Sequence, residues 1–400
     1  KSVERKEKSE KAPALYDLTS LQRDANRVLG YTSQQTLDYL QALYEKKLCT
    51  YPRTDSRYLT DDMEGSVPGL VAAAAAVCGM EKPPTICAKQ VCSSKKVTDH
   101  HAIVPTISAE KVDIASLPLG EREVLKLAAR GLLRAVDEPH RYAETVITVD
   151  CAGQSFTAKG KTVLAPGWKR YEQEQAEAAP ALPVVTEQQT LSVSAASVKT
   201  GKTTPPKHFT EDTLLAAMEN AGKENMPDDA ERKGIGTPAT RSGIIEKLVS
   251  SGFVERRKSK KITNLLPTST GTALITVLPE QLQSPQLTAE WEHRLKEIER
   301  GEIASASFMD GIAAMLNELV QTYKPIPGTE VLFPSGREVV GRCPRCGAEV
   351  TESQKGFFCE NRTCSFVLWK NSRFFAAKKK ALTKSLAAAL LKNGRAPLKC

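Results

Sequence analysis

Apolar residues recur every three or four positions in two neighbouring segments near the start of the chain. In each segment, residues 19–30 and 32–47, the repeat begins with a Thr-x-x-Gln capping box, at Thr19 and at Thr32. A glycine ends the first repeat, so the pattern predicts two helices joined by a short turn. Tyr51 then lies just beyond the second helix, on a short extended segment.

The rest of the pattern predicts both helices and strands. Further helices are expected at residues 120–136, 209–221, 238–250, 290–300 and 305–322. Runs rich in β-branched and aromatic residues predict strands at residues 142–149, 155–159 and 191–198. Residues 253–256 and 262–266 flank a basic turn and predict a hairpin after the helices, as in a winged helix. A multidomain α+β protein is therefore expected.

The length and charge of the chain narrow its class. At 400 residues it is too long for a single core of typical size, so more than one domain is expected. Lys and Arg number 56 against 47 Asp and Glu, which gives a formal net charge of +9 and an isoelectric point near 8.9. This excess favours a polyanionic partner, and nucleic acid is the leading candidate.

No apolar run is long enough for a membrane helix, which needs about 18 apolar residues or more. Residues 1–11 lack the apolar core of a signal peptide, and the first residue is not Met. We therefore expect a cytoplasmic protein with no membrane partner, and a chain that is a piece of a longer one.

The ten cysteines are too sparse for a disulfide scaffold, and four of them cluster late in the chain. CPRC contributes Cys343 and Cys346, and CENRTC contributes Cys359 and Cys364. Two pairs of thiols at this spacing are typical of tetrahedral zinc ligation. Four unrelated thiols are the alternative.

The stretch CTYPRTDSRY, residues 49–58, places a phenol and a guanidinium two positions apart. A phenol has a pKa of about 10, so Tyr51 needs help to attack phosphorus. Residues two apart on an extended segment point the same way, and Arg53 could there hold phosphate oxygens in a fork. Gln41 and Glu45 share a face of the preceding helix, where they could orient a nucleotide or its leaving hydroxyl. A packing tyrosine and a solvated helical face are the alternatives.

Two further motifs could contact a phosphodiester. DHHAIVPT sets His100 and His101 beside Asp99, and a histidine can donate a hydrogen bond or a proton to a phosphate. GIGTPATR, residues 234–241, puts glycines and hydroxyls at a predicted helix start, where free backbone N–H groups favour a DNA phosphate. A histidine that caps a loop and a plain helix cap are the alternatives.

These stretches resemble a type IA DNA topoisomerase, and they are most similar to the bacterial topoisomerase III group. The resemblance runs in family order from about residue 13 to residue 301. The matching stretches are PALYDLTSLQRDANRVLGYTSQQTLDYLQALYEKKLCTYPRTDSRYL, DHHAIVPT, PPKHFTEDTLLAAMENAG, GIGTPATRSGIIEKL, LLPTSTG and LTAEWEHRLKEIERG.

The resemblance implies roles for individual residues. Tyr51 would be the nucleophile that forms a 5′-phosphotyrosine with one DNA strand, and Arg53 would stabilise that phosphate. Gln41, Glu45 and His100 match active-site positions of the family. The residues expected to contact DNA are Thr50, His101, Gly236, Thr240 and Arg241.

The resemblance also implies a torus of successive domains. A helical domain with the tyrosine would span residues 13–138, and a β arch would span residues 139–206. A helical, winged-helix-like domain at residues 207–324 would line the DNA groove. Residues 1–12 would end a preceding arch segment, and residues 325–400 would form a zinc-ribbon-like module with a truncated topoisomerase C-terminal repeat.

Members of this family carry an N-terminal Toprim domain whose Asp-x-Asp-x-Glu cluster binds Mg²⁺, and no such cluster occurs in this sequence. We therefore expect a fragment with half an active site, whose Mg²⁺ ligands lie in that domain, and Zn²⁺ in the cysteine module. The expected partner is DNA, preferably single-stranded. The expected state is a nucleoid-associated, cytoplasmic monomer.

The implied activity is cleavage of one DNA strand, passage of another strand and religation, which relaxes or unlinks DNA. ATP is not needed for it, and no GxxxxGK[ST] phosphate loop occurs in the sequence. A non-catalytic module that binds single-stranded DNA, with a salt-dependent affinity, is the alternative. A tyrosine recombinase does not fit, because the sequence lacks a His-x-x-Arg constellation before a late tyrosine.

Overall fold

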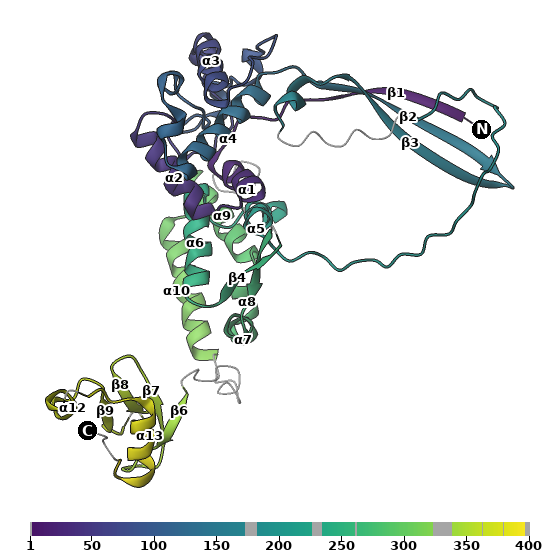
Figure 1. Ribbon diagram of the computed structural model, residues 1–400. Coiled ribbons are helices and arrows are strands. Elements are labelled where there is room, and N and C mark those ends of the chain that lie inside the picture. Colours follow the sequence, from purple (N-terminus) through teal and green to yellow (C-terminus); the bar gives the residue numbers. More distant parts are fainter. Residues whose placement is uncertain are drawn as a thin grey trace. The chain divides into compact units, whose positions relative to one another are not determined.

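The computed structural model describes residues 2–172, 182–225, 234–260, 262–322, 338–361, 363–378 and 380–396. It divides the chain into two compact units, Lys1–Thr322 and Tyr323–Cys400 (Figure 1). The domain boundary expected at residues 324 and 325 lies outside the described residues. No helix in the described ranges is long and apolar enough to cross a membrane.

The first helical part of unit 1, residues 13–138, surrounds one apolar core. Its helices are α1 (Leu18–Leu29), α2 (Ser33–Glu45), α3 (Val67–Cys78) and α4 (Leu119–Ala135). Its 3₁₀ turns are η1 (Asp61–Ser66), η2 (Ala88–Gln90), η3 (Ser94–Lys96), η4 (Ile107–Lys111) and η5 (Ile114–Ser116). Leu21, Leu40 and Leu125 are fully buried where α1, α2 and α4 meet, so hydrophobic burial holds this part together.

Local hydrogen bonds set the helix ends in this part. The carboxylate of Asp17 accepts the N–H of Ser20 and caps α1 in a capping box. The box expected at Thr19 is therefore wrong, because a carboxylate directly before the helix satisfies the free N–H groups first. Thr32 caps α2 in a box, as predicted. Gly30 ends α1 at a φ of 72°, in the left-handed region that favours glycine.

A three-stranded antiparallel sheet, the arch sheet, extends from this part (Figure 1). Its strands, in the order β1-β2-β3, are β1 (Ser2–Glu10), β2 (His140–Cys151) and β3 (Gln154–Ala165). The strands expected at 142–149 and 155–159 are confirmed and are longer than predicted. β1 is not predicted, because SVERKEKSE offers charged residues on both faces and no apolar alternation. The strand expected at 191–198 is wrong, since that range carries neither helix nor strand.

The second helical part of unit 1, residues 209–322, has an apolar core of its own. Its helices are α5 (Glu211–Asn220), α6 (Pro238–Ser250), α7 (Ser269–Val277), α8 (Glu280–Gln283), α9 (Gln286–Glu299) and α10 (Ser305–Thr322), and the 3₁₀ turn η7 (Lys223–Asn225) follows α5. The 3₁₀ turn η6 (Gly167–Tyr171) follows β3 instead, and its Tyr171 belongs to the core of the first part. Strands β4 (Val254–Ser259) and β5 (Ile262–Pro267) pair as the predicted hairpin. The core contains Leu215, Met218, Ile245 and Leu265, and it is separate from that of the first part.

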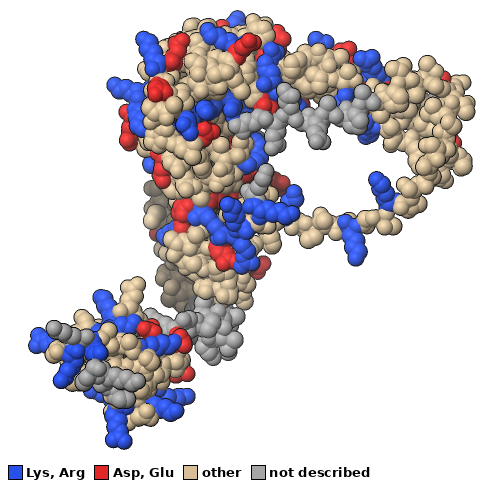
Figure 2. Space-filling model, viewed as in Figure 1, with Lys and Arg blue, Asp and Glu red and all other residues tan. Residues whose placement is uncertain are grey.

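Unit 2 is a small sheet covered by a helix. Its strands, in the order β6-β7-β8-β9, are β6 (Val339–Arg342), β7 (Glu349–Glu352), β8 (Gly356–Cys359) and β9 (Val367–Trp369). Its helices are α12 (Arg373–Ala377) and α13 (Lys384–Asn393). Val350 and Phe357 are fully buried and form the centre of its core. On the face drawn in Figure 2, Lys and Arg prevail over Asp and Glu in this unit.

The packing of α4 against Tyr16 gives a test of the first core. A Cβ at Gly131 would lie 2.3 Å from a ring carbon of Tyr16, whose hydroxyl donates to Asp24 and accepts from Arg134. We expect Gly131→Ala to lower the free energy of unfolding by about 1–3 kcal/mol, because this buried ring has no free space to move into.

Gly69→Ala in α3 is the matched control, because its Cβ would meet only Ile107 at an ordinary 3.6 Å. We expect this control to be neutral or stabilising, since alanine favours a helix over glycine. Urea denaturation of the two variants measures both effects. Equal stability of Gly131→Ala and the wild type would contradict the close packing of Tyr16 on α4.

Candidate active site

Tyr51 lies between two rings. Its ring centroid is 4.1 Å from that of His100 and 5.5 Å from that of Tyr44, which meets it edge-on at 84°. Tyr44 belongs to α2, and His100 belongs to a loop about fifty residues later in the chain. Tyr51 is only half-buried. The ring is therefore fixed in orientation, and part of the side chain remains open to solvent.

Backbone pairing brings these two distant segments together. Thr50 pairs with Val104 through its backbone N–H at 3.0 Å, and its hydroxyl donates to the carbonyl of Ala102 at 3.0 Å. The hydroxyl of buried Thr54 donates to the carbonyl of His100 at 2.7 Å. These bonds hold the loop that carries His100 against the segment that carries Tyr51.

Arg53 faces a cleft in unit 1 with a volume of about 680 Å³. The residues that line this cleft are Asp17, Arg53, Thr54, Asp55, Thr98, Asp99, His100, Glu219, Lys223, Gly236, Thr237, Pro238, Ala239 and Arg241. The cleft thus lies between the two helical parts. Tyr51 is not among its lining residues, whereas its ring partner His100 is.

The expected alignment of Tyr51 and Arg53 on an extended segment is wrong, because the chain bends at Pro52 and Arg53. Proline fixes its own φ and favours such a bend. The side chain of Arg53 is exposed and reaches the cleft. The role of Arg53 at a phosphate stays a prediction, and its geometry differs from the one the sequence suggested.

Gln41 and Glu45 lie on one face of α2, as their spacing predicts. The amide of Gln41 donates to the carboxylate of Glu45 at 3.0 Å. Both residues belong to α2, the helix that also carries Tyr44, and the ring of Tyr44 contacts the ring of Tyr51. Neither residue lines the cleft.

The glycine-rich segment at residues 234–241 forms the turn and the capped N-terminus of α6. Gly234 has a φ of +85°, and a Cβ there would lie 2.3 Å from the carbonyl oxygen of Met218, so only glycine fits. The hydroxyl of Thr240 accepts the N–H of Thr237 at 2.8 Å in a capping box. The helix cap that was the alternative reading is therefore present, and the DNA contact of Thr240 stays a prediction.

Arg241 joins this segment to the first helical part. Its side chain is 3% exposed and donates to the carbonyls of Ile235 and Gly236 at 3.1 Å and to the hydroxyl of Thr19 at 3.0 Å. Burial lowers the pKa of its guanidinium. Arg241 therefore shapes the floor of the cleft. His101 does not line the cleft, and its Nδ1 lies 2.9 Å from the carbonyl oxygen of Ala102.

Sequence reasoning missed part of the cleft. Asp17 lies in it and caps α1, and burial raises the pKa of its carboxyl group. Thr54 places His100, and Glu219 comes from α5 on the opposite wall. An aspartate before a helical repeat is a helix-start signal that could have found Asp17. No local signal could have found Glu219, because only the packing of the two helical parts brings it there.

In unit 2 the four predicted cysteines do converge. The Sγ atoms of Cys343 and Cys364 are 3.7 Å apart, and those of Cys346 and Cys359 are 3.4 Å apart. All four sulfur atoms lie within 4.8 Å of one another. Zinc–sulfur bonds of about 2.3 Å in a tetrahedron need a spacing of this size, so the cluster can hold a zinc ion.

Protons on this cluster are held unevenly. The backbone N–H of Ala348 lowers the pKa of the Cys346 thiol to about 7, and burial raises that of Cys359 to about 12. Zinc binding requires the thiolate forms and would release these protons. Within the ranges that the structure describes, this is the one group of three or more such ligands close enough to hold a metal.

Zinc removal tests this centre. We expect Cys346→Ser to abolish stoichiometric zinc and to unfold unit 2, whose small core needs the metal crosslink. Zinc content by atomic emission and hydrogen exchange at residues 356–359 measure the two effects. Cys151→Ser, a thiol of the arch sheet, is the control that should leave both unchanged. A Cys346→Ser protein with full zinc and a protected β8 would contradict the ligand assignment.

Comparison with known proteins places most of the chain in one family. A family model described as DNA topoisomerase matches residues 1–310. The chain is 37% identical over 378 residues to DNA topoisomerase 3 of Bacillus subtilis (strain 168), which covers 88% of this chain and 51% of that protein. It is likewise 37% identical over 377 residues to DNA topoisomerase 3 of Bacillus licheniformis, with the same two coverages. The chain therefore spans about half the length of the curated relatives it matches.

A solved structure agrees in fold. Full-length topoisomerase I from Thermotoga maritima superposes with a TM-score of 0.56 at 20% sequence identity, over 92% of this chain and 58% of that one. The multidomain α+β fold expected from the sequence is thereby confirmed, while the closed ring stays a prediction. Because the family model covers more than half of the chain, and the relatives are of the topoisomerase III kind, the chain belongs to the type IA DNA topoisomerase family.

Proposed function

We propose that the protein containing this chain is a type IA DNA topoisomerase that cleaves one DNA strand through Tyr51, passes another strand through the break and religates the first. The observation that carries the proposal is the fixed ring of Tyr51 between Tyr44 and His100, next to a cleft that Arg53 and His100 line. A packing tyrosine would be enclosed, whereas this one is half-exposed.

In the proposed step, the phenol oxygen of Tyr51 attacks a backbone phosphorus. A P–O bond to Tyr51 forms as the phenol gives up its proton, and the P–O bond to the 3′ oxygen breaks. The 3′ oxygen gains a proton and leaves as a hydroxyl, so the proton lost by the phenol balances the one gained. The 5′ phosphate stays on the tyrosine, so the bond energy is kept and ATP is not needed. Religation is the reverse reaction.

We assign the supporting roles by position. Arg53 stabilises the charge that develops on the phosphate oxygens, since a guanidinium provides paired donors for them. His100 donates a hydrogen bond to the same phosphate from the wall of the cleft. Gln41 and Glu45 orient the nucleotide on the α2 side of the tyrosine. Thr50, His101, Gly236, Thr240 and Arg241 shape or contact the path of the strand.

The remaining expectations belong to the whole protein. Mg²⁺ ligands are proposed to lie in a Toprim domain of the kind the family carries, and Zn²⁺ in the cysteine cluster of unit 2. The strand that enters the cleft is proposed to be single-stranded, because the tyrosine must reach one backbone. We propose a monomer that acts in the cytoplasm on the nucleoid, and domain limits as set out from the sequence.

Covalent adduct formation tests the nucleophile. The chain is mixed with single-stranded DNA labelled at its 3′ end and with Mg²⁺, with and without the Toprim domain of a topoisomerase III relative, and the reaction is stopped with detergent. We expect labelled protein only with that domain present, and none from Tyr51→Phe, because the phenol oxygen is the attacking atom. Tyr44→Phe, which keeps the neighbouring ring, is the control that should retain the adduct.

A complete assembly that binds DNA but forms no adduct under these conditions would sink the nucleophile assignment. The non-catalytic module that holds single-stranded DNA would then be the better function. Its binding would weaken as the salt concentration rises, and Tyr51→Phe would change nothing beyond binding.

The cleft arginine gives a second test. We expect Arg53→Ala to slow adduct formation by about 10²–10³-fold, which is the usual loss when one donor to a developing oxyanion is removed. Arg57→Ala, an exposed arginine of the same loop that does not line the cleft, should keep the rate within a few-fold. Single-turnover kinetics measure both. Equal rates for the two variants would remove Arg53 from the phosphate.

A further inference from the structure

The two helical parts of unit 1 meet through polar contacts. Each part has its own apolar core. Between them, Arg23 of α1 forms an ion pair with Asp212 of α5 at 2.8 Å, and Arg241 donates to the hydroxyl of Thr19. Polar interfaces of this kind permit relative motion of the parts they join.

A third polar contact between the parts is made by the buried carboxylate of Glu211, the first residue of α5. Glu211 is 3% exposed. One of its oxygens accepts the backbone N–H of Ser33 at 2.6 Å and the hydroxyl of Ser33 at 2.7 Å. Ser33 is the first residue of α2. The negative charge therefore sits at the N-terminus of α2, where the helix dipole favours it.

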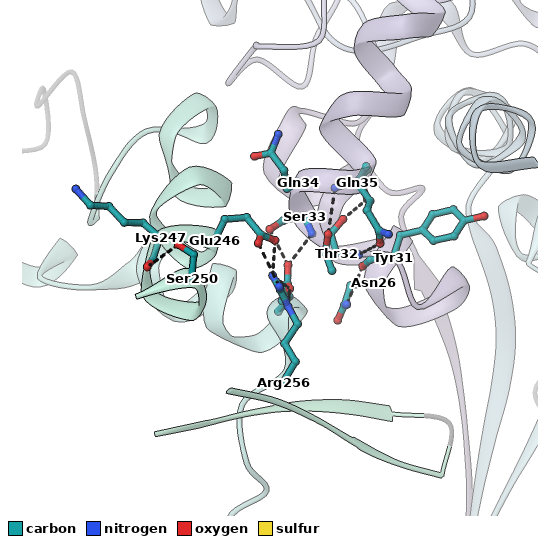
Figure 3. Close-up of polar contacts among 12 residues, drawn as sticks. Asn26, Tyr31, Thr32, Ser33, Gln34, Gln35, Glu246, Lys247, Ser250 and Arg256 are labelled. Carbon is teal, nitrogen blue, oxygen red and sulfur yellow. Dashed lines mark hydrogen bonds and ion pairs between the residues drawn. The ribbon is translucent and has the colours of Figure 1, made fainter. Parts of the chain in front are cut away.

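Arg256 of β4 holds the other oxygen of Glu211. Its Nε donates at 2.9 Å, and the same guanidinium bonds to Glu246 of α6 (Figure 3). Arg256, Glu246 and Glu211 all belong to the second helical part. If the two parts separated, Glu211 would keep its arginine, and only the Ser33 donors would pass to water. An unpaired buried charge would make separation costly, and separation of the two parts would leave none.

Helix α2 connects this contact to the proposed reaction. Ser33 begins the helix, Gln41 and Tyr44 lie near its end, and Tyr51 follows. A movement of α2 away from α5 would carry the tyrosine side of the cleft away from the side that Glu219 and Gly236 line.

We propose that Glu211 is a positioning residue that latches the two helical parts together through the N-terminus of α2, and that release of its bonds to Ser33 opens the cleft. This inference rests on the proposed function for its purpose, since strand passage needs a gap. The contacts of Glu211 with Ser33 and Arg256 do not depend on the proposed function. Arg256 keeps the carboxylate of Glu211 aimed at Ser33, so the contact can form again when the parts close.

The test uses the whole chain without DNA. Two fluorescent labels, at Ser66 in the first part and at Ser259 on the hairpin of the second, report the separation of the parts in single molecules. Hydrogen exchange at the N–H of Ser33 reports the latch itself. We expect Glu211→Gln to raise the open population and the exchange rate about tenfold, because a neutral acceptor loses the charge-assisted part of the bonds.

Glu246→Gln is the matched control. It removes a partner of Arg256, and the hydrogen bonds and ion pair given for Glu246 in the described residues all go to Arg256 of the second part, so the separation should stay as in the wild type. Ser33→Ala should add less than its own effect to Glu211→Gln, since both remove the same contact. The thermal unfolding midpoint of each variant tells a positioning role from a merely structural one.

Unchanged separation and exchange in Glu211→Gln would overturn the latch. The same outcome for Glu246→Gln as for Glu211→Gln would also overturn it, because general loosening of the second part would then explain both. In the adduct assay, Glu211→Gln should form the adduct within about twofold of the wild type while strand passage changes several-fold. An open–closed shift without any wild-type adduct would keep the latch and defeat the proposed function.

Discussion

The pairing of residues 49–54 with residues 100–106 is the constraint on which the candidate site depends. The hydroxyl groups of Thr50 and Thr54 each donate a hydrogen bond to a backbone carbonyl of the second segment. Hydroxyls that are hydrogen-bonded in this way resist displacement, because breaking such a bond leaves both its donor and its acceptor without a partner. The ring of His100 is therefore kept on Tyr51 by hydrogen bonds from threonine hydroxyls to the backbone of its loop, and not by the weak attraction between the rings themselves.

This constraint also separates rigid from movable parts of unit 1. The tyrosine, its ring partners and Arg53 all belong to the first helical part, with one continuous apolar core beneath them. The far wall of the cleft belongs to the second part and its separate core. A single continuous core under the tyrosine favours a reacting group that must be placed to a fraction of an ångström. A far wall with a separate core favours a path that must admit a polymer. The polar contacts between the parts, which include those of the buried Glu211 and Arg241, lie at the boundary between these two arrangements.

Much of the fold follows from local pattern. α6 and α10 begin and end where the apolar spacing predicts, and in α6 the cap at Thr237 and the proline at the first position agree with that spacing. β1 escapes prediction because its nine residues carry charge on both faces, and only the neighbouring strand β2 makes it a strand. The cap of α1 is misplaced by two residues because two different helix starters, Asp17 and Thr19, compete within one turn. In each miss a tertiary or local competitor decides, which the periodicity alone does not contain.

The site divides along the same line. The four cysteines are found from spacing because a hairpin-sized module brings near neighbours together. Tyr51 is found from its own short stretch only as one of many tyrosines, and its partner His100 is joined to it by folding alone. Arg53 shows the limit most clearly. Its spacing to Tyr51 is right for a shared phosphate on a straight strand, yet Pro52 bends the chain and sends the guanidinium into the cleft. A phosphate that meets both groups must then lie at the edge of the cleft, between the half-exposed phenol and the arginine. In the proposed reaction that position would also be next to His100, and the three groups that would meet the phosphate, Tyr51, Arg53 and His100, all belong to the first helical part of unit 1.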